Sequence, residues 1–347
     1  MIEIDGSHGE GGGAILRTAL ALSTITGKPF RITKIRSGRP QPGLKREHLY
    51  CIRILQELSG AKCEDAHLGS ESIMFVPGKI KSKKVSYDLE TAASTTLVAQ
   101  CVILAAIFSG KRATLSLTGG TDVKWSVPAD YLANIFAPAL KPLGDVSVRI
   151  VRRGYYPRGQ GLLEVTVKGH EQMDGSRLPR LELLTRGNLL VVEGVVHASL
   201  ALEDAQVALR MKEMAELSLA TLSKPVLVRQ SYSETANTGA EITLWARCQR
   251  TVLGASALGE QGVRAEKVAE RAVKELKELL ASDAAVDEHL ADQLVPYLAV
   301  CGGSLKTTKI TDHLRSNVYV CERFLDVTFA MDEHMGIVRS TPSSTDE

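Results

Sequence analysis

Residues 20–38, LALSTITGKPFRITKIRSG, are matched by residues 102–120, VILAAIFSGKRATLSLTGG. Each stretch contains the end of an apolar helical pattern, a Gly-Lys turn and a strand with period-two alternation. The Gly-Lys pair recurs after 83 residues, which is too long a period for a solenoid repeat. The flanking segments, 1–80 and 85–168, both read as strand, helix, strand, helix and two strands. We therefore predict an α/β (α+β) fold of repeated βαβαββ modules, akin to those of enolpyruvate transferases, each with its helices on one face of a sheet.

The rest of the chain predicts a third module that is interrupted. A loop at 169–180 leads into a small α/β unit, and helical and strand patterns then resume up to residue 338. We expect residues 1–183 and 269–338 to form a large catalytic domain and residues 184–268 to form a small inserted α/β domain. The polar segment 339–347 should be a disordered tail, because it has little apolar surface to bury.

The composition is that of an ordinary globular protein, with 44% hydrophobic and 24% charged residues. The net charge is only +2, so a nucleic-acid partner would have to be argued from local clustering of charge. The six cysteines are scattered without a C-x-x-C pair, which argues against a zinc ribbon and a disulfide framework. The N-terminus is no secretory signal, and the apolar run at 97–108 is too short to span a bilayer. We expect a cytoplasmic protein with no membrane partner.

A glycine-rich loop, GSHGEGGG at residues 6–13, connects a predicted strand to a predicted helix. It fits neither common nucleotide motif, because residues 31–34 are basic where a dinucleotide fold has an acid and no G-K-[S/T] follows. Bare backbone amides at a helix N-terminus can still hold an anion. Glu10 would repel a phosphate unless a divalent cation lay between them. The alternative is a tight structural turn in which Glu10 is merely solvated.

The segment 31–48 is basic. Arg36 and Arg39 flank a Ser-Gly turn at the predicted end of a strand, where α/β sheets place ligands. Arginine forks bind phosphate oxygens through paired hydrogen bonds. The segment also carries Arg31, Lys34, Lys45 and Arg46, with no acid before Glu47. The sequence therefore favours a site for a polyanionic group, and the alternative is a solvated basic face.

Together these residues resemble the RNA 3′-terminal phosphate cyclase family. The supporting stretches are DGSHGEGGGAILRTALALS, IRSGRPQPGLKREHL, TLVAQ, TGGTDVKWSVPADY, RRGYYPRGQG, HLADQL and TDHLRSN, in the family's order and spacing. The resemblance implies ATP-dependent conversion of an RNA 3′-phosphate to a 2′,3′-cyclic phosphodiester through a covalent histidine–AMP intermediate, with release of AMP and diphosphate. It also implies an RNA with a 3′-phosphate end as partner, and a homodimer.

The resemblance assigns roles to individual residues. The nucleophile falls on His313, a residue that composition alone could not choose among eight histidines. The ligand of Mg²⁺ or Mn²⁺ falls on Glu10. The residues that bind phosphate or the RNA end are Arg17, Arg36 and Arg39. The residues that bind ATP are Gln100, Pro128, Tyr131, His289, Leu290, Ala291, Asp292 and Gln293. Without the resemblance, Gln100 would be a packing residue and Asp292 a helix-surface charge.

The chain departs from the family pattern at three positions, Glu47, Gln160 and His289, which could alter contacts to the RNA end or the base. Two other functions remain open. A non-catalytic, cyclase-like ribosome-assembly protein would keep the fold and the basic surface, but such relatives lack the histidine nucleophile. An enolpyruvate transferase would bind phosphoenolpyruvate and no ATP, but this chain lacks about one hundred residues of the usual two-domain length.

Overall fold

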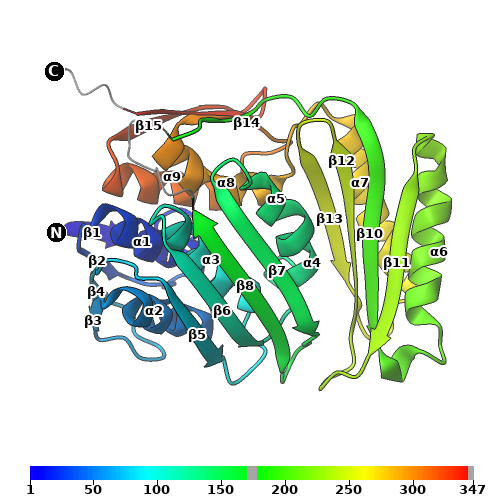
Figure 1. Ribbon diagram of the computed structural model, residues 1–347, viewed down its shortest axis with the longest axis horizontal. Coiled ribbons are helices and arrows are strands. Elements are labelled where there is room, and N and C mark those ends of the chain that lie inside the picture. The colour runs from blue at the N-terminus through cyan, green and yellow to red at the C-terminus, as the bar shows by residue number, and fades with distance from the viewer. Residues whose placement is uncertain (170–177, 343–347) are drawn as a thin grey trace.

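Three sheets of the protein share one strand order, as the computed structural model shows for residues 1–169 and 178–342 (Figure 1). In each sheet the first strand is parallel to the second, which is antiparallel to the fourth, and the third strand lies at the edge. The first sheet has the order β1-β2-β4-β3, with β1 (Ile2–Asp5), β2 (Phe30–Thr33), β3 (Lys62–Glu64) and β4 (Ile73–Val76). The second has the order β5-β6-β8-β7, with β5 (Lys83–Asp88), β6 (Arg112–Gly119), β7 (Gly144–Arg152) and β8 (Gly161–Gly169). The third has the order β9-β14-β16-β15, with β9 (Leu181–Leu183), β14 (Gly303–Lys306), β15 (Val327–Asp332) and β16 (Ile337–Pro342). The predicted repeat of βαβαββ modules is confirmed.

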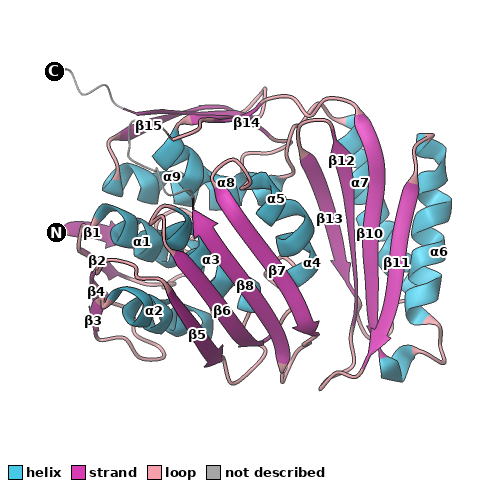
Figure 2. Cartoon of the chain, viewed as in Figure 1, coloured by secondary structure: helices cyan, strands magenta, loops and turns pink. Residues whose placement is uncertain are grey.

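Each module places its helices against one face of its sheet, and these helices pack together into one core. The first module has α1 (Gly13–Thr26) and α2 (Arg46–Ser59), and the third has α8 (Glu288–Cys301) and α9 (Asp312–Phe324). The second has α3 (Thr95–Ile107) and then α4 (Ala129–Tyr131), a π-helical turn at Leu132–Phe136 and α5 (Ala137–Ala139). α1 and α3 are the most apolar of these and lie at the centre of the core. Figure 2 shows the sheet of β5, β6, β8 and β7 in front of its helices, with the opposite face turned to the viewer.

A fourth sheet belongs to the inserted unit, with the order β11-β10-β12-β13. Its elements are β10 (Leu189–Ser199), α6 (Val207–Leu219), β11 (Val226–Ser233), β12 (Ala240–Cys248), β13 (Val252–Leu258) and α7 (Ala265–Ala281). Helices α6 and α7 cover this sheet and bury a second apolar core. The expected boundary at residue 268 falls inside α7, whose Val268, Val273 and Leu276 belong to the second core. The third module already has its two helices, so α7 extends the inserted unit.

The segment after residue 338 differs from the expectation of a disordered tail. Residues 339–342 continue β16, which pairs with both β14 and β15, and the adjoining Val338 is fully buried. The expectation is therefore wrong for these four residues, because strand pairing satisfies their backbone. Residues 343–347, and residues 170–177 of the expected loop, lie outside the described residues.

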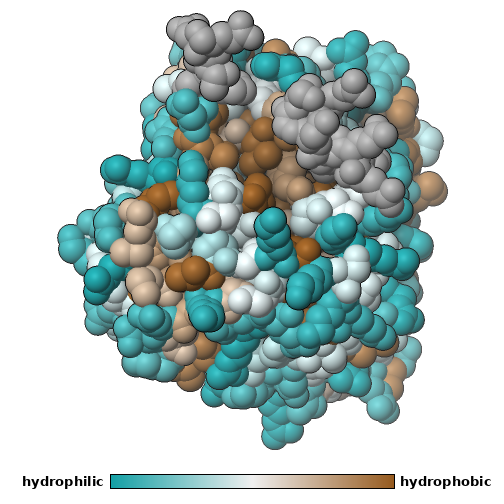
Figure 3. All heavy atoms as spheres, turned by 60° about the vertical axis from the view of Figure 1, so that its left-hand side comes forward, coloured by the Kyte–Doolittle hydropathy of each residue, from teal (hydrophilic) through white to brown (hydrophobic). Residues whose placement is uncertain are grey.

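The surface is mostly hydrophilic on the face that carries the N-terminal strands (Figure 3). Some hydrophobic side chains are visible there in a hollow. Among the helices that the structure describes, none combines the length and the apolar character needed to cross a membrane.

Candidate active site

The glycine loop brings Glu10 next to two nitrogen-bearing side chains from distant parts of the chain. Oε1 of Glu10 pairs with Nη2 of Arg39, and Oε2 lies 2.9 Å from Nδ1 of His313. Glu10 lies between β1 and α1, Arg39 lies in the loop after β2, and His313 lies in the first turn of α9. The start of α9 is fixed by Thr311, whose side chain accepts a hydrogen bond from the backbone N–H of Leu314. The first and third modules therefore meet at this carboxylate.

The surroundings of His313 favour a neutral ring with one free nitrogen. Burial lowers its pKa below the usual value, and the positive charges of Arg17 and Arg39 lower it further. In a neutral ring with the proton on Nδ1, that N–H donates to Glu10 and Nε2 keeps an unshared electron pair. The side chain is about half exposed, at 51%. His313 can therefore act as a nucleophile near neutral pH.

Two glycines of the loop allow close approach of the surrounding side chains. A Cβ atom on Gly12 would lie 3.4 Å from Nη2 of Arg39 and 3.8 Å from Cε1 of His313. A Cβ atom on Gly13 would lie only 2.1 Å from Nε2 of His48, which is incompatible with the present packing. The backbone at residues 12 and 13 is therefore bare where the ionic side chains meet. This arrangement leaves room for an anionic group beside the start of α1.

The three predicted phosphate-binding arginines are not equivalent. Arg17 is close enough to His48 and His313 to lower the pKa of both rings. Arg39 reaches Glu10, and 36% of its side chain is exposed. Arg36 is buried and donates to the backbone oxygens of Gln41 and Gly43, at 2.6 and 3.0 Å. Arg17 and Arg39 thus face the glycine loop, whereas Arg36 holds the shape of the loop that follows it.

A second group of predicted residues lies where α4 meets the start of α8. The rings of Tyr131 and His289 are 6.4 Å apart and almost perpendicular, and Pro128 is the residue just before α4. The hydroxyl of Tyr131 donates to Oδ1 of Asp287, the residue before α8. His289 also lowers the pKa of His313, which relates this group to the glycine loop. Pro128, Tyr131 and His289 therefore belong to one region near the candidate nucleophile.

The remaining predicted residues are Gln100 in α3 and four consecutive positions of α8. Leu290 and Ala291 are buried in the main core and turn away from solvent. Asp292 accepts a hydrogen bond from the hydroxyl of Thr311, and burial raises its pKa to about 7. In the described part of the chain, Nε2 of Gln100 and Oε1 of Gln293 are buried without a hydrogen-bond partner. Such unpaired groups are costly and need an explanation.

Three further residues support the site and were not predicted. Asn317 links three helices, since it accepts from Thr18 of α1 at 2.8 Å and donates to the backbone of Asp292 at 2.8 Å. Asn317 could have been found from the sequence, because it stands four residues after His313 and therefore lies on the same face of the helix. His48 accepts a hydrogen bond from the backbone N–H of Lys45 at 3.0 Å. Asp287 could have been found from the sequence, because it stands just before a predicted helix, where an aspartate caps the first turn.

A divalent cation fits the glycine loop only together with a substrate. Each carboxylate oxygen of Glu10 already contacts another side chain, Oε1 the guanidinium group of Arg39 and Oε2 the ring of His313. Mg²⁺ is commonly held by one or two carboxylates, several waters and substrate phosphate oxygens. The donor set therefore suits a metal that arrives with a phosphorylated ligand.

Comparison with known proteins gives one consistent family. A family model described as RNA 3′-terminal phosphate cyclase matches residues 8–331. The chain is 42% identical to the RNA 3′-terminal phosphate cyclase of Pyrococcus abyssi, with 97% of this chain and 96% of that protein covered. It is 43% identical to the protein of that name from Thermococcus gammatolerans, with coverage of 96% and 95%. The Archaeoglobus fulgidus protein of that name is 41% identical, with coverage of 94% and 96%.

Proposed function

This chain belongs to the RNA 3′-terminal phosphate cyclase family, and from that premise we propose that it uses ATP to convert an RNA 3′-phosphate to a 2′,3′-cyclic phosphodiester through an adenylated His313. The observation that carries the proposal is the contact of 2.9 Å between Nδ1 of His313 and Oε2 of Glu10. Because Nδ1 faces the carboxylate, Nε2 on the other side of the ring is left for the nucleotide, and Cε1 of the same ring lies 3.8 Å from the position of a Cβ atom on Gly12. The enzyme is then a ligase that forms a phosphoric ester bond.

The reaction divides into three displacements at phosphorus. First, Nε2 of His313 forms a bond to the α-phosphorus of ATP, the bond from that phosphorus to the bridging oxygen breaks, and diphosphate leaves. An oxygen of the RNA 3′-phosphate then attacks the same phosphorus, and the bond to Nε2 breaks. Finally, the 2′-oxygen loses its proton and attacks the 3′-phosphorus, and AMP leaves. A covalent intermediate replaces one difficult displacement by easier ones.

The carboxylate of Glu10 supports the first displacement. When Nε2 bonds to phosphorus, the imidazole ring becomes positively charged. Glu10 accepts the Nδ1–H bond and stabilises that charge, as a carboxylate does for other catalytic histidines. The cationic groups of Arg17 and Arg39 neutralise negative charge on the phosphates, where positioning and electrostatics provide most of the catalysis.

Mg²⁺ or Mn²⁺ would be held by Glu10 together with phosphate oxygens, and its chemistry would be neutralisation of charge on the leaving diphosphate. The nucleotide base would lie near Pro128, Tyr131 and His289. We assign Gln100 and Gln293 to the same ligand because Nε2 of Gln100 and Oε1 of Gln293 have no hydrogen-bond partner among the described residues, and a base offers both a hydrogen-bond acceptor and a donor. Leu290 and Ala291 are buried, so they would shape the pocket from behind rather than touch the ligand through their side chains.

Labelling with ATP that carries a radioactive α-phosphate tests the proposal. The wild-type protein should retain label as an acid-labile, base-resistant adduct, and it should convert RNA with a 3′-phosphate to a phosphatase-resistant product. His313→Ala should lose both. His334→Ala is the matched control, because His334 is exposed in the turn between β15 and β16. An adduct that persists in His313→Ala, or no adduct in the wild type, would end the proposal.

The same experiment separates the alternatives. A non-catalytic relative would bind RNA without forming an adduct, and an enolpyruvate transferase would need no ATP. The direct contact between Glu10 and His313 favours the catalytic function. A homodimer and a cytoplasmic location stay predictions, which light scattering and fractionation of cells would test.

A further inference from the structure

Five exposed cationic residues lie together at one end of β5 and β6, far along the sheet from the candidate active site. We call them the basic edge, and they are Lys79, Lys81, Lys84, Lys111 and Arg112. The first two precede β5, Lys84 is its second residue, Lys111 lies in the turn after α3, and Arg112 begins β6. Strands β5 and β6 are paired in parallel, so their starting ends lie side by side.

The basic edge differs from neighbouring lysines in its contacts. In the described part of the chain, none of the five side chains has an ion pair or a hydrogen bond. Their neighbour Lys83 differs, since it pairs with Glu57 at 2.9 Å. Lys28 differs too, although it occupies the equivalent Gly-Lys turn of the first module, because its ammonium group donates to the backbone oxygen of Phe324 at 2.7 Å. In a chain of net charge +2, this is a local surplus of positive charge.

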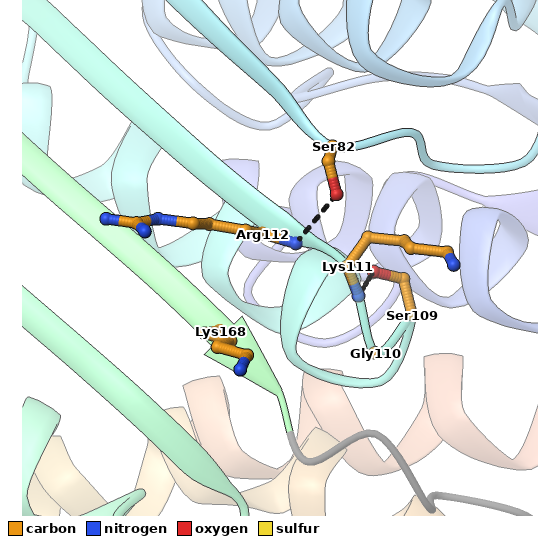
Figure 4. A pocket seen from close by; sticks show the side chains of 6 residues that line it. All are labelled: Ser82, Ser109, Gly110, Lys111, Arg112 and Lys168. Carbon is orange, nitrogen blue, oxygen red and sulfur yellow. Dashed lines mark hydrogen bonds between the residues drawn. The ribbon is translucent and has the colours of Figure 1, made fainter.

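The geometry of the edge suits an extended anion better than a single phosphate. Part of it lines a depression of about 410 Å³ with Ser82, Ser109, Gly110 and Lys168 (Figure 4). In Figure 4 the side chains of Lys111 and Arg112 extend in opposite directions. The backbone N–H groups of these two residues already donate to the hydroxyls of Ser109 and Ser82, at 3.1 and 3.3 Å. The head groups therefore do not converge on one point, and the amides do not form an anion nest.

The edge is too far from His313 to contact the same phosphate. The other end of β6 leads through the following loop to α4, where Tyr131 contacts His289, and His289 is close enough to His313 to lower its pKa. The eight residues of β6 span about 26 Å at about 3.3 Å per residue. A strand of RNA whose 3′ end lay at His313 would reach the edge only with nucleotides well upstream of that end.

We propose that the basic edge binds the sugar–phosphate backbone of the RNA substrate upstream of its 3′ end. The proposal rests on the proposed function, which makes RNA the substrate. The edge contains no aromatic side chain on which a base could stack, so the contact is independent of base sequence. Its contribution is to affinity for long RNA and not to the chemical steps.

The experiment compares RNA lengths in a variant with Lys81→Gln, Lys84→Gln, Lys111→Gln and Arg112→Gln. The control variant also loses four charges, through glutamine at Lys212, Lys267, Arg271 and Lys274, which form surface ion pairs on α6 and α7. The probes are 3′-phosphorylated RNAs of about 4 and about 16 nucleotides, the two ends of the range of single-strand site sizes. Binding is measured by fluorescence anisotropy at several salt concentrations, and turnover of the short RNA is measured in parallel.

Loss of four phosphate contacts should lower the salt slope for the long RNA by about 2.8, at about 0.7 for each contact. Between about 50 and 200 mM salt, binding by the wild type should therefore weaken about 50-fold more than binding by the edge variant. Turnover of the short RNA should be unchanged, which also shows that the variant is folded, and the control variant should behave as the wild type does.

The proposal is overturned if the salt slope for long RNA is unchanged, or if the short RNA loses as much affinity as the long one. It is also overturned if polyglutamate, an acidic polypeptide, binds in an edge-dependent manner while long RNA does not. Failure of the proposed function has a different signature, which is the absence of turnover by the wild type with either RNA. In that case the salt slope for long RNA still decides whether the edge binds RNA.

Discussion

Replacement of the buried Glu241 by glutamine should make the protein less sensitive to high pH. Glu241 lies in β12 and is fully buried between the inserted unit and the second module. Nη1 of Arg153 pairs with Asp130, and lies 3.3 Å from Oδ1 of Asp122 and 3.9 Å from Oε2 of Glu241. Thr243 donates to Oε1 of Glu241, while Oε2 has no hydrogen-bond partner among the described residues. Three buried carboxyl groups therefore share one guanidinium group.

One guanidinium group cannot neutralise three carboxylates. Burial raises the pKa of Glu241 well above its usual value, and the charges of Asp130 and Asp122 raise it further. Burial also raises the pKa of Asp130. We therefore expect Glu241 to keep its proton in the folded protein at neutral pH. The space between the carboxyl groups is occupied by Arg153, which argues against a metal ion at this position.

The sign of the pH effect follows from the proton balance. In the unfolded chain, Glu241 ionises near pH 4.3, so above that pH the folded state binds one proton more than the unfolded state. The stability that this proton provides is complete at low pH and is lost as pH rises toward the folded pKa. One proton corresponds to about 1.4 kcal/mol per pH unit, so from pH 5 to pH 8 the wild type loses up to about 4 kcal/mol at this position. Glutamine cannot ionise, and Glu241→Gln lacks this loss.

The assay is urea unfolding of the wild type and of Glu241→Gln at pH 5, 6, 7 and 8. The free energy of unfolding of the variant relative to the wild type should rise by up to about 1.4 kcal/mol per pH unit. Glu203→Gln is the control, because Glu203 is exposed and should give a constant difference. Parallel curves for Glu241→Gln and the wild type would show that Glu241 is ionised in the folded state, and the reasoning would be refuted.

Three further predictions concern the glycine loop, the backbone conformation of Gln160 and the candidate nucleophile. Gly13→Ala should lower the free energy of unfolding by about 1 to 3 kcal/mol, because the new Cβ atom would overlap with buried His48. Urea unfolding measures this, with Gly38→Ala as a control that has open space, and an equal effect of both changes would contradict the packing argument. Gln160→Gly should raise the free energy of unfolding by up to about 1 kcal/mol, because Gln160 has a φ of 56°, a conformation that costs energy for a residue with a side chain. Urea unfolding measures this, and a lower free energy of unfolding would refute it. The rate of adduct formation with ATP should rise with pH and reach half of its plateau value below pH 6.5, because the pKa of His313 is lowered and the ring must lose its proton to act; a half-maximal rate above pH 6.5 would show that this pKa is not lowered.

The modules could be predicted from the sequence because their periodicity is local. The pair of Gly-Lys turns, at Gly27 and Gly110, aligns two segments that do form equivalent helices and strands. The third module was harder to define, because its first strand, β9, has only three residues and pairs with β14 far along the chain. The amphipathic pattern of α7 predicts a helix, but it does not say which of two sheets the helix covers.

The candidate site could be predicted only in part, because its contacts join distant segments. The glycine loop and the basic turn indicate an anion site from local sequence, yet nothing local connects Glu10 to His313. Their proximity was expected only from a family resemblance. The buried position of Arg36 was not expected, since exposure depends on how the loop at residues 41–43 folds back over it.

The repeated topology explains why an inserted unit can take part in the site. In every module the connection from the first strand to the first helix lies at the same end of the sheet. The first module has the glycine loop at this connection, and the third has the entire inserted unit between β9 and α8. The unit therefore emerges at the end of the molecule where nucleotide binding is proposed. Asp287 joins the three parts of the chain at this end. It accepts hydrogen bonds from the hydroxyl of Tyr131 in the second module, from the backbone N–H of Gly254 in the inserted unit at 3.0 Å, and from the backbone N–H of Leu290 in α8 at 2.9 Å. A carboxylate shared by three parts of the chain fixes how α8 begins, and with it the position of His289.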